Sequence, residues 1–196
     1  DYNHVDGRFP VQYVIRPQTD EYHDYRGYAG RIEGGIFRVG DKIKVLPSGF
    51  ESEIKSIDTL NESLDIAYAP QSVSISIAED IDISRGDMIV KANNIPVQSQ
   101  DITAMISWFH ERPLNIGGKY ALRHTTKDIK CMVKEVRFKM DINSLERDYD
   151  DKNVKMNDIA RIQIRTTQPL FFDPYRKNRN TGSFILIDEV TNETVG

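Results

Sequence analysis

The sequence has 196 residues with 26 Lys or Arg, 30 Asp or Glu, a formal net charge of -4 and a pI near 5.6. No apolar run reaches the roughly 20 residues of a membrane helix. The acidic balance argues against a general polyanion binder, because neutralising phosphates needs clustered basic residues. We therefore expect neither a membrane nor a nucleic-acid partner.

The charge is unevenly distributed along the chain. Residues 1–95 hold 10 basic and 16 acidic residues, and residues 96–196 hold 16 and 14, so the two halves carry -6 and +2. This asymmetry favours two domains with different surfaces. Residues 93–96, Asn-Asn-Ile-Pro, are the best linker between them. The predicted domains are therefore 1–95 and 96–196.

Cysteine content and the N-terminus indicate a cytoplasmic protein. The single cysteine, Cys131, cannot form an internal disulfide or a cysteine-rich metal site, which fits a reducing compartment. It lies in a short apolar and basic run and is interpreted as a buried strand residue. The first residues show no secretory signal. The abrupt start before a strand predicts a fragment of a longer protein.

The chain opens with strand periodicity. Apolar residues alternate with other residues from Phe9 to Ile15, Pro17 ends this strand, and residues 18–26 are predicted to be a polar loop. Residues 27–43 then read as a strand, a glycine turn and a second turn that leads into another strand. Glycine supplies the positive φ that such corners need. A second Gly-Asp pair repeats the pattern, so the structural turns are assigned to Gly30, Gly35, Gly40, Asp41, Gly86, Asp87 and Gly182.

The remaining first half is also strand-like. Strands are expected at residues 42–46, around Ile54 and Ile57, at 72–77 and at 88–90, with a Pro-Ser-Gly turn after the first. Residues 59–71 contain the only plausible short helical turn in this half.

The second half has the same character. Alternating strands are expected at 102–109, 120–124, 136–142, 160–165 and 184–188, with a break at 167–170 and a polar loop at 146–155. That loop is acidic but lacks the glycine and the closing glutamate of an EF-hand. Many short strands with almost no helical period predict an all-β fold of two consecutive antiparallel β-barrels.

Motifs for chemistry are mostly absent. Gly117-Gly118-Lys119 precedes a strand and not a helix, so it is no phosphate-binding loop, and the sequence has no Asn-Lys-x-Asp guanine clamp. The four histidines are scattered, and His124 is interpreted as structural. Cys131 has no activating histidine nearby in sequence. No catalytic, cofactor-binding or metal-binding residues are assigned.

One polar cluster stands out before the last strand. Residues 173–182 bring together three cations and two amides, and Arg side chains suit bidentate contacts with carboxylates or phosphates. The alternative is a solvated basic loop, and composition does not decide between the two. Arg176, Lys177, Arg179 and Asn180 are the candidate partner or anion surface.

Four segments together resemble a known family. They are Arg-Phe-Pro-Val-Gln-Tyr-Val (residues 8–14), the corner at 27–43, Ile-Asp-Ile-Ser-Arg-Gly-Asp (81–87) and Arg-Asn-Thr-Gly-Ser-Phe-Ile-Leu-Ile-Asp (179–188). The glycine corner resembles the second domain of translation-factor GTPases. The complete set is similar to the large, GTP-hydrolysing subunit of bacterial sulfate adenylyltransferase.

The resemblance implies a function for the parent protein. That subunit has a GTPase domain followed by two barrels, and only the barrels match here. GTP and Mg²⁺ would bind the missing domain, so no nucleotide-binding residue can be assigned. The parent would form adenosine 5′-phosphosulfate from ATP and sulfate together with a small catalytic subunit. These residues would contact that subunit and their own GTPase domain, and alone they would be inactive.

Two other functions stay open. The first is a pair of barrels from a translation elongation or initiation factor that binds tRNA or the ribosome; the acidic first half counts against it. The second is a freestanding small enzyme, which the lack of a paired acid and base disfavours.

Overall fold

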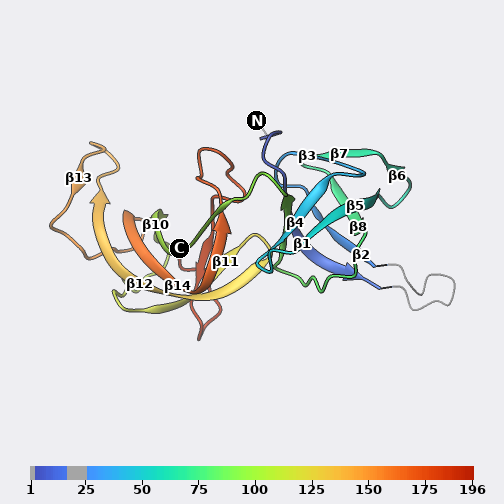
Figure 1. Cartoon of the computed structure of the whole chain (residues 1–196). Helices are drawn as coiled ribbons and strands as arrows, with labels where there is room; N and C mark the ends of the chain where they lie inside the picture. The colour runs from blue at the N-terminus through green and yellow to red at the C-terminus, as the bar shows by residue number, and fades with distance from the viewer. Residues whose placement is uncertain (1–2, 17–25) are drawn as a thin grey trace. The chain divides into compact units, whose positions relative to one another are not determined.

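A computed structural model describes residues 3–16 and 26–196 (Figure 1). The regular elements of this part of the chain are all β-strands, so the predicted all-β class is confirmed. Pro17 and nearly all of the predicted loop at 18–26 lie outside the described residues. No helix among those residues is long and apolar enough to cross a membrane.

The first of two compact units contains the described residues up to Val97, Thr125–Lys127 and Phe171–Ser183. Its strands are β1 (Arg8–Ile15), β2 (Gly27–Arg31), β3 (Ile36–Arg38), β4 (Lys42–Leu46), β5 (Glu51–Asp58), β6 (Ser63–Leu64), β7 (Ile66–Tyr68), β8 (Ser72–Ile77) and β9 (Met88–Lys91). Antiparallel ladders connect β4-β9-β1-β2-β8-β5, and β5 pairs back with β4. The pairings of these six strands thus form a ring.

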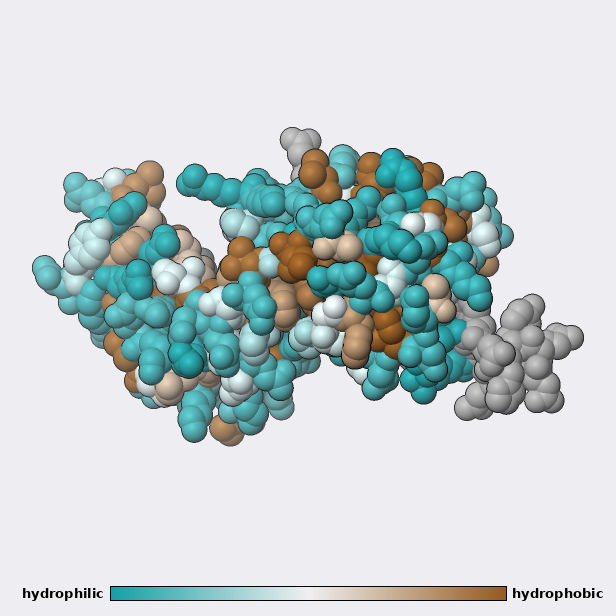
Figure 2. All heavy atoms as spheres, viewed as in Figure 1, coloured by the Kyte–Doolittle hydropathy of each residue, from teal (hydrophilic) through white to brown (hydrophobic). Residues whose placement is uncertain are grey.

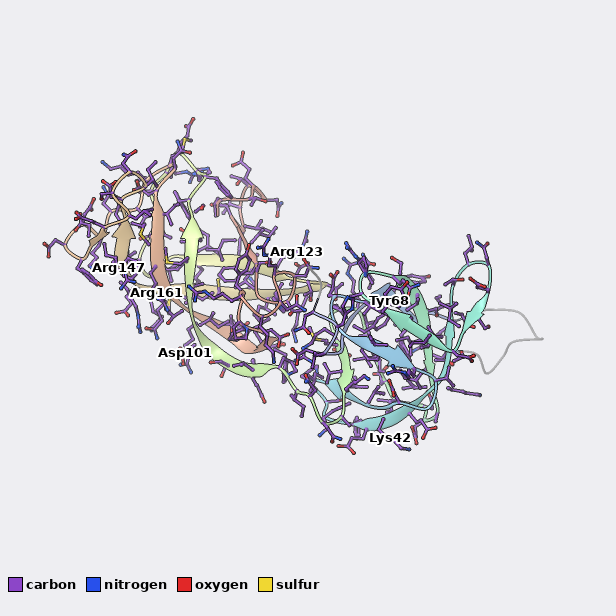
Figure 3. The ribbon with its side chains drawn as sticks, turned by 90° about the horizontal axis from the view of Figure 1, so that it is seen from above. Lys42, Tyr68, Asp101, Arg123, Arg147 and Arg161 are labelled. Carbon is purple, nitrogen blue, oxygen red and sulfur yellow. The ribbon has the colours of Figure 1, made fainter. Side chains whose placement is uncertain are left out.

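Alternation along the strands places the core of the first unit. Val73 and Ile75 of β8 point inward with Phe9 of β1 and Ile57 of β5, and all four are at least 95% buried. The ring of Phe37 on β3 meets that of Phe9 edge to face, with 6.4 Å between centroids. Charged side chains such as Lys42 lie on the outside of the unit (Figure 3).

The helical turn predicted within residues 59–71 is wrong. These residues form β6 and β7, and β7 pairs with β3 so that Ala67 is buried opposite Phe37. Leu60, which was expected on the apolar side of the helix, is 99% exposed. A few apolar residues at helical spacing cannot fix so short a helix against strand pairing.

The second unit contains Gln98–His124, Asp128–Leu170 and Phe184–Gly196. Its strands are β10 (Val97–Ser107), β11 (Lys119–His124), β12 (Lys127–Met140), β13 (Arg147–Asp148), β14 (Ile159–Phe172) and β15 (Ile185–Ile187). They pair in the order β10-β14-β12-β11-β15, with β13 added to β12. The long, curved β12 and β14 run side by side (Figure 1).

The strand break predicted at residues 167–170 is wrong, because β14 continues to Phe172. Pro169 has no N–H to donate, but the register of β14 with β12 ends at Thr166. The proline therefore removes no bond from that ladder.

The predicted division between residues 95 and 96 differs from the observed grouping in one segment. Phe171–Ser183 belongs to the first unit, although it follows most of the second unit in sequence. Polar contacts described below hold it there. The visible surface of the molecule is mostly hydrophilic with small hydrophobic patches (Figure 2).

Candidate functional site

The segment Phe171–Ser183, which carries the predicted basic cluster, is anchored by a buried ion pair. Arg8 on β1 donates from Nε to Asp173 Oδ2 at 2.8 Å and from its second terminal nitrogen to Oδ1 at 3.0 Å. Both side chains are at least 97% buried. Arg8 also donates to the carbonyls of Gly7 and Asn94, and the Thr181 hydroxyl donates to Asp173 at 2.7 Å. The guanidinium charge is thus matched inside the first unit.

Two asparagines fix the next part of the segment. Asn178 is buried; its Oδ1 accepts the backbone N–H groups of Asn180 and Thr181, and its Nδ2 donates to the Glu33 carbonyl at 3.0 Å. Asn180 donates from Nδ2 to the Glu33 carboxylate. The segment is therefore tied to the glycine corner between β2 and β3.

Lys177 is fixed in a similar way. Its ammonium lies 3.1 Å from Asp6 Oδ1, and the buried Asp6 also accepts hydrogen bonds from Asn3 and Asn94. Burial opposes ionisation of Asp6, but these three hydrogen bonds outweigh it and lower the pKa of the carboxyl. Lys177 thus serves an internal contact.

The predicted surface of four residues therefore divides in two. All four are exposed, but Lys177 and Asn180 hold the segment in place. The side chains of Arg176 and Arg179 make no hydrogen bond or ion pair with the described residues. The neighbouring Tyr175 is 57% exposed. Two unpaired guanidinium groups and an aromatic ring are what this segment can offer to a partner.

The two Gly-Asp corners have the same geometry. Asp41 accepts the Arg38 N–H at 2.8 Å through its carboxylate and donates its own N–H to the Arg38 carbonyl at 3.0 Å. Asp87 does the same with Ser84, at 2.9 and 3.1 Å. Gly40 (φ 87°) and Gly86 (φ 95°) occupy the third turn position, where type II turns need positive φ. β4 and β9, which follow these corners, pair with each other.

The other predicted turn glycines serve two different needs. Gly35 has a positive φ of 75°. At Gly30 an added Cβ would lie 2.4 Å from the Pro10 carbonyl oxygen, and at Gly182 it would lie 2.5 Å from Tyr175 Cα. Gly30 and Gly182 are therefore needed for close backbone approach rather than for positive φ.

The lone cysteine and His124 are both buried in strands. Cys131 lies on β12 as predicted, and burial, with the charge of Glu189, raises the pKa of its thiol to about 12. Such a thiol is a poor nucleophile. His124 is buried at the end of β11. Among the described residues, no three His, Cys, Asp or Glu side chains are grouped to hold a metal ion.

Sequence reasoning missed the anchors of this site. Arg8 entered only as part of a motif, and Asp173 only as the first residue of a loop. In an alternating strand the neighbour of the inward-facing Phe9 is expected on the solvent side, so no local signal marks Arg8 as buried. Its partner, 165 positions away, is not visible in the sequence.

Comparison with known proteins shows which families the chain resembles. A profile of the family "GTP-eEF1A C-terminal domain-like" matches residues 101–196. The matched residues include β11, β12, β14 and β15.

The chain as a whole is similar to sulfate-activating proteins. It is 43% identical over 194 residues to sulfate adenylyltransferase subunit 1 of Bacteroides fragilis (strain YCH46), covering 99% of this chain and 40% of that protein. It is 44% identical over 196 residues to the bifunctional enzyme CysN/CysC of Mycobacterium tuberculosis (strain ATCC 25618 / H37Rv), covering 100% and 32%. The resemblance read from the sequence is confirmed, and the chain spans less than half the length of these relatives.

Solved structures give the same fold. The structure of Sup35 complexed with GMPPNP superposes with a TM-score of 0.85 at 16% identity, covering all of this chain and 47% of that one. At this identity the likeness shows a shared fold alone. The fold expected from the translation-factor resemblance is confirmed.

Proposed function

We propose that this chain is the C-terminal, two-domain part of the GTP-hydrolysing subunit of a sulfate adenylyltransferase. The observation that carries the proposal is similarity over the whole chain, at 43–44% identity, to proteins with that name or with the name CysN/CysC. The parent protein forms adenosine 5′-phosphosulfate and pyrophosphate from ATP and sulfate in the cytoplasm. It does so as a heterodimer with a small catalytic subunit, driven by GTP hydrolysis.

These 196 residues contribute contacts and not catalysis. GTP and Mg²⁺ bind in a separate domain of the parent protein, since the sequence has no phosphate-binding loop. A GTPase does work on a partner only if its two nucleotide states differ in their contacts with that partner. The two β units provide the surfaces whose contacts with the partner would differ between the two nucleotide states.

The surface that we assign to a partner is the outward side of Phe171–Ser183. Arg176 and Arg179 are exposed and unpaired among the described residues, and the segment below them is held by Arg8 and Asp173. A fixed backbone lowers the entropy cost of presenting two guanidinium groups. An acidic surface of the small subunit or of the GTPase domain suits them.

Charge reversal tests this surface. The parent protein with R176E and R179E should bind the small subunit at least tenfold more weakly in a titration by light scattering or calorimetry. The matched control is K55E with R85E, which makes the same charge change at two exposed residues of the same unit. Equal affinity for both double variants would remove Phe171–Ser183 from the interface.

The enzymatic proposal has its own test. The parent protein mixed with the small subunit should release pyrophosphate from ATP and sulfate, and GTP should accelerate that release. The 196-residue chain in place of the parent should neither bind GTP nor support release. Absence of GTP-dependent release with the parent protein would contradict the proposed function. GTP binding by the 196-residue chain would contradict the proposal that GTP binds only in a separate domain.

A further inference from the structure

A hollow of about 500 Å³ lies within the second unit. Three parts of the chain meet there: the residues after β10, the turn before β14 and the C-terminal residues. Backbone hydrogen bonds join them, from Trp108 to the Asp158 carbonyl at 3.0 Å and from Phe109 to the Val195 carbonyl at 2.8 Å. Its lining consists of Phe109, His110, Glu111, Met156, Glu193 and Thr194.

The imidazole in this hollow is held in a defined orientation. The Trp108 indole donates to the Arg112 carbonyl at 2.8 Å and folds the loop back, so that the Arg112 N–H donates to His110 Nδ1 at 3.0 Å. The neutral ring therefore carries its proton on Nε2. Nε2 lies 3.5 Å from Glu193 Oε2.

The lining combines apolar surface with negative charge. Phe109 is 55% exposed and Met156 42%, so a ring and a thioether are open to a ligand. The Glu193 side chain is 62% exposed, and Glu111 is exposed with no ion pair among the described residues. Neither carboxylate has a lysine or arginine partner within the part of the chain that the structure describes. A ligand that fits needs a cationic, flat and partly apolar group.

We propose that this hollow receives an arginine side chain of a partner protein. A guanidinium is planar, stacks on aromatic surface and donates two parallel hydrogen bonds to a carboxylate, whereas an ammonium is a compact and strongly hydrated charge. The methylene stem can cover Phe109 and Met156 while the head reaches Glu111 and Glu193. Charge complementarity thus selects the occupant. This inference does not depend on the proposed enzymatic function.

Methyl NMR of the 196-residue chain tests the proposal. The protein contains five methionines, so the signal of Met156 can be assigned with M156L in a ¹³C-methyl-methionine sample. The probes are acetyl-Gly-Arg-Gly-amide, the same peptide with citrulline and free L-arginine. Citrulline keeps the shape of arginine but has no charge. The arginine peptide should shift the Met156 signal in a saturable way, with at least fivefold higher affinity than the citrulline peptide.

Matched variants locate the response. E111Q with E193Q should weaken binding of the arginine peptide at least fivefold, while E135Q with E189Q, two glutamates elsewhere in the second unit, should leave it unchanged. The Glu193 side chain is solvent-exposed, and it is the Glu193 backbone carbonyl that accepts the Asp188 N–H in the local turn. E193Q should therefore fold normally. The other four methionine signals check this.

Three results would overturn the proposal: no saturable shift with the arginine peptide, equal binding of the citrulline peptide, or an equal loss in both double variants. Binding of free L-arginine at least tenfold tighter than the peptide would indicate a small-molecule site and would also contradict a protein partner.

Discussion

At the scale of single residues, Arg8 decides how the late segment Phe171–Ser183 is placed. Its side chain is 1% exposed and donates to three acceptors, and Asp173 is the one that carries a charge. A buried charge is stable only while its partner is present, because isolated ions are expensive to transfer out of water. Removing either charge should therefore do more than remove one contact.

Asp173→Asn should lower the free energy of unfolding by about 3 kcal/mol, since it leaves the Arg8 guanidinium buried without a counter-charge. Urea unfolding followed by far-UV circular dichroism measures this loss. Glu53→Gln breaks the exposed pair with Lys42 and is the control, with a much smaller expected loss because water screens exposed ion pairs. If the two losses are similar, the Arg8 and Asp173 pair is not what holds the segment.

Asp6 gives a prediction about pH. Its pKa is lower in the folded chain than the usual 3.8, so protonation favours the unfolded state. The stability that its ionised form contributes is complete above pH 3.8 and is lost as the pH falls through the lower, folded-state pKa. Asp6→Asn should thus be less stable than the natural chain at pH 7, and the gap should shrink at pH 3. Urea midpoints at both values measure it, and a gap that stays constant would contradict the assignment.

At the scale of elements, glycines in the first unit allow tight turns and close strand pairing in two physically different ways. Gly40 needs a positive φ but has open space around it, with the nearest atom to an added Cβ at 3.9 Å. Gly30 has no positive φ, but β1 passes so close that a Cβ would meet the Pro10 carbonyl at 2.4 Å. One position is a conformational requirement and the other a packing requirement.

Asparagine separates these two requirements, because it tolerates the left-handed region better than alanine but is larger. Gly40→Ala should cost about 1–2 kcal/mol of stability, and Gly40→Asn should cost less. Gly30→Ala should cost about 2–3 kcal/mol, and Gly30→Asn at least as much. Thermal or urea unfolding of the four variants gives the order, and a rescue by asparagine at Gly30 would show that the close approach to Pro10 is not limiting.

At the scale of the whole molecule, the question is whether the chain is a part of a sulfate-activating enzyme or a nucleic-acid module. This chain shares its fold with Sup35 at only 16% identity. The fold therefore does not decide the function. Charge and sequence similarity are the discriminating properties, and both favour the enzyme.

The chain should not bind tRNA or ribosomal RNA in a gel shift at about 100 mM salt with protein up to about 10 µM, since its net charge of -4 gives little counterion release. A shift that weakens steeply with added salt would support the translation-factor alternative and contradict our proposal.

The sequence by itself determined the all-β class, because alternating apolar residues and turn glycines are local signals that tertiary structure seldom reverses. It also determined the two Gly-Asp corners and the burial of Cys131. It failed where local signals were weak, at residues 59–71 and at Pro169, where pairing with β3 and the end of the β12 ladder decided the outcome. Only the tertiary structure decided that Lys177 and Asn180 are internal anchors, that Arg176 and Arg179 are free of described partners, and that Asp173 neutralises Arg8. Contacts between residues more than 100 positions apart depend on chain folding, and no local pattern encodes them.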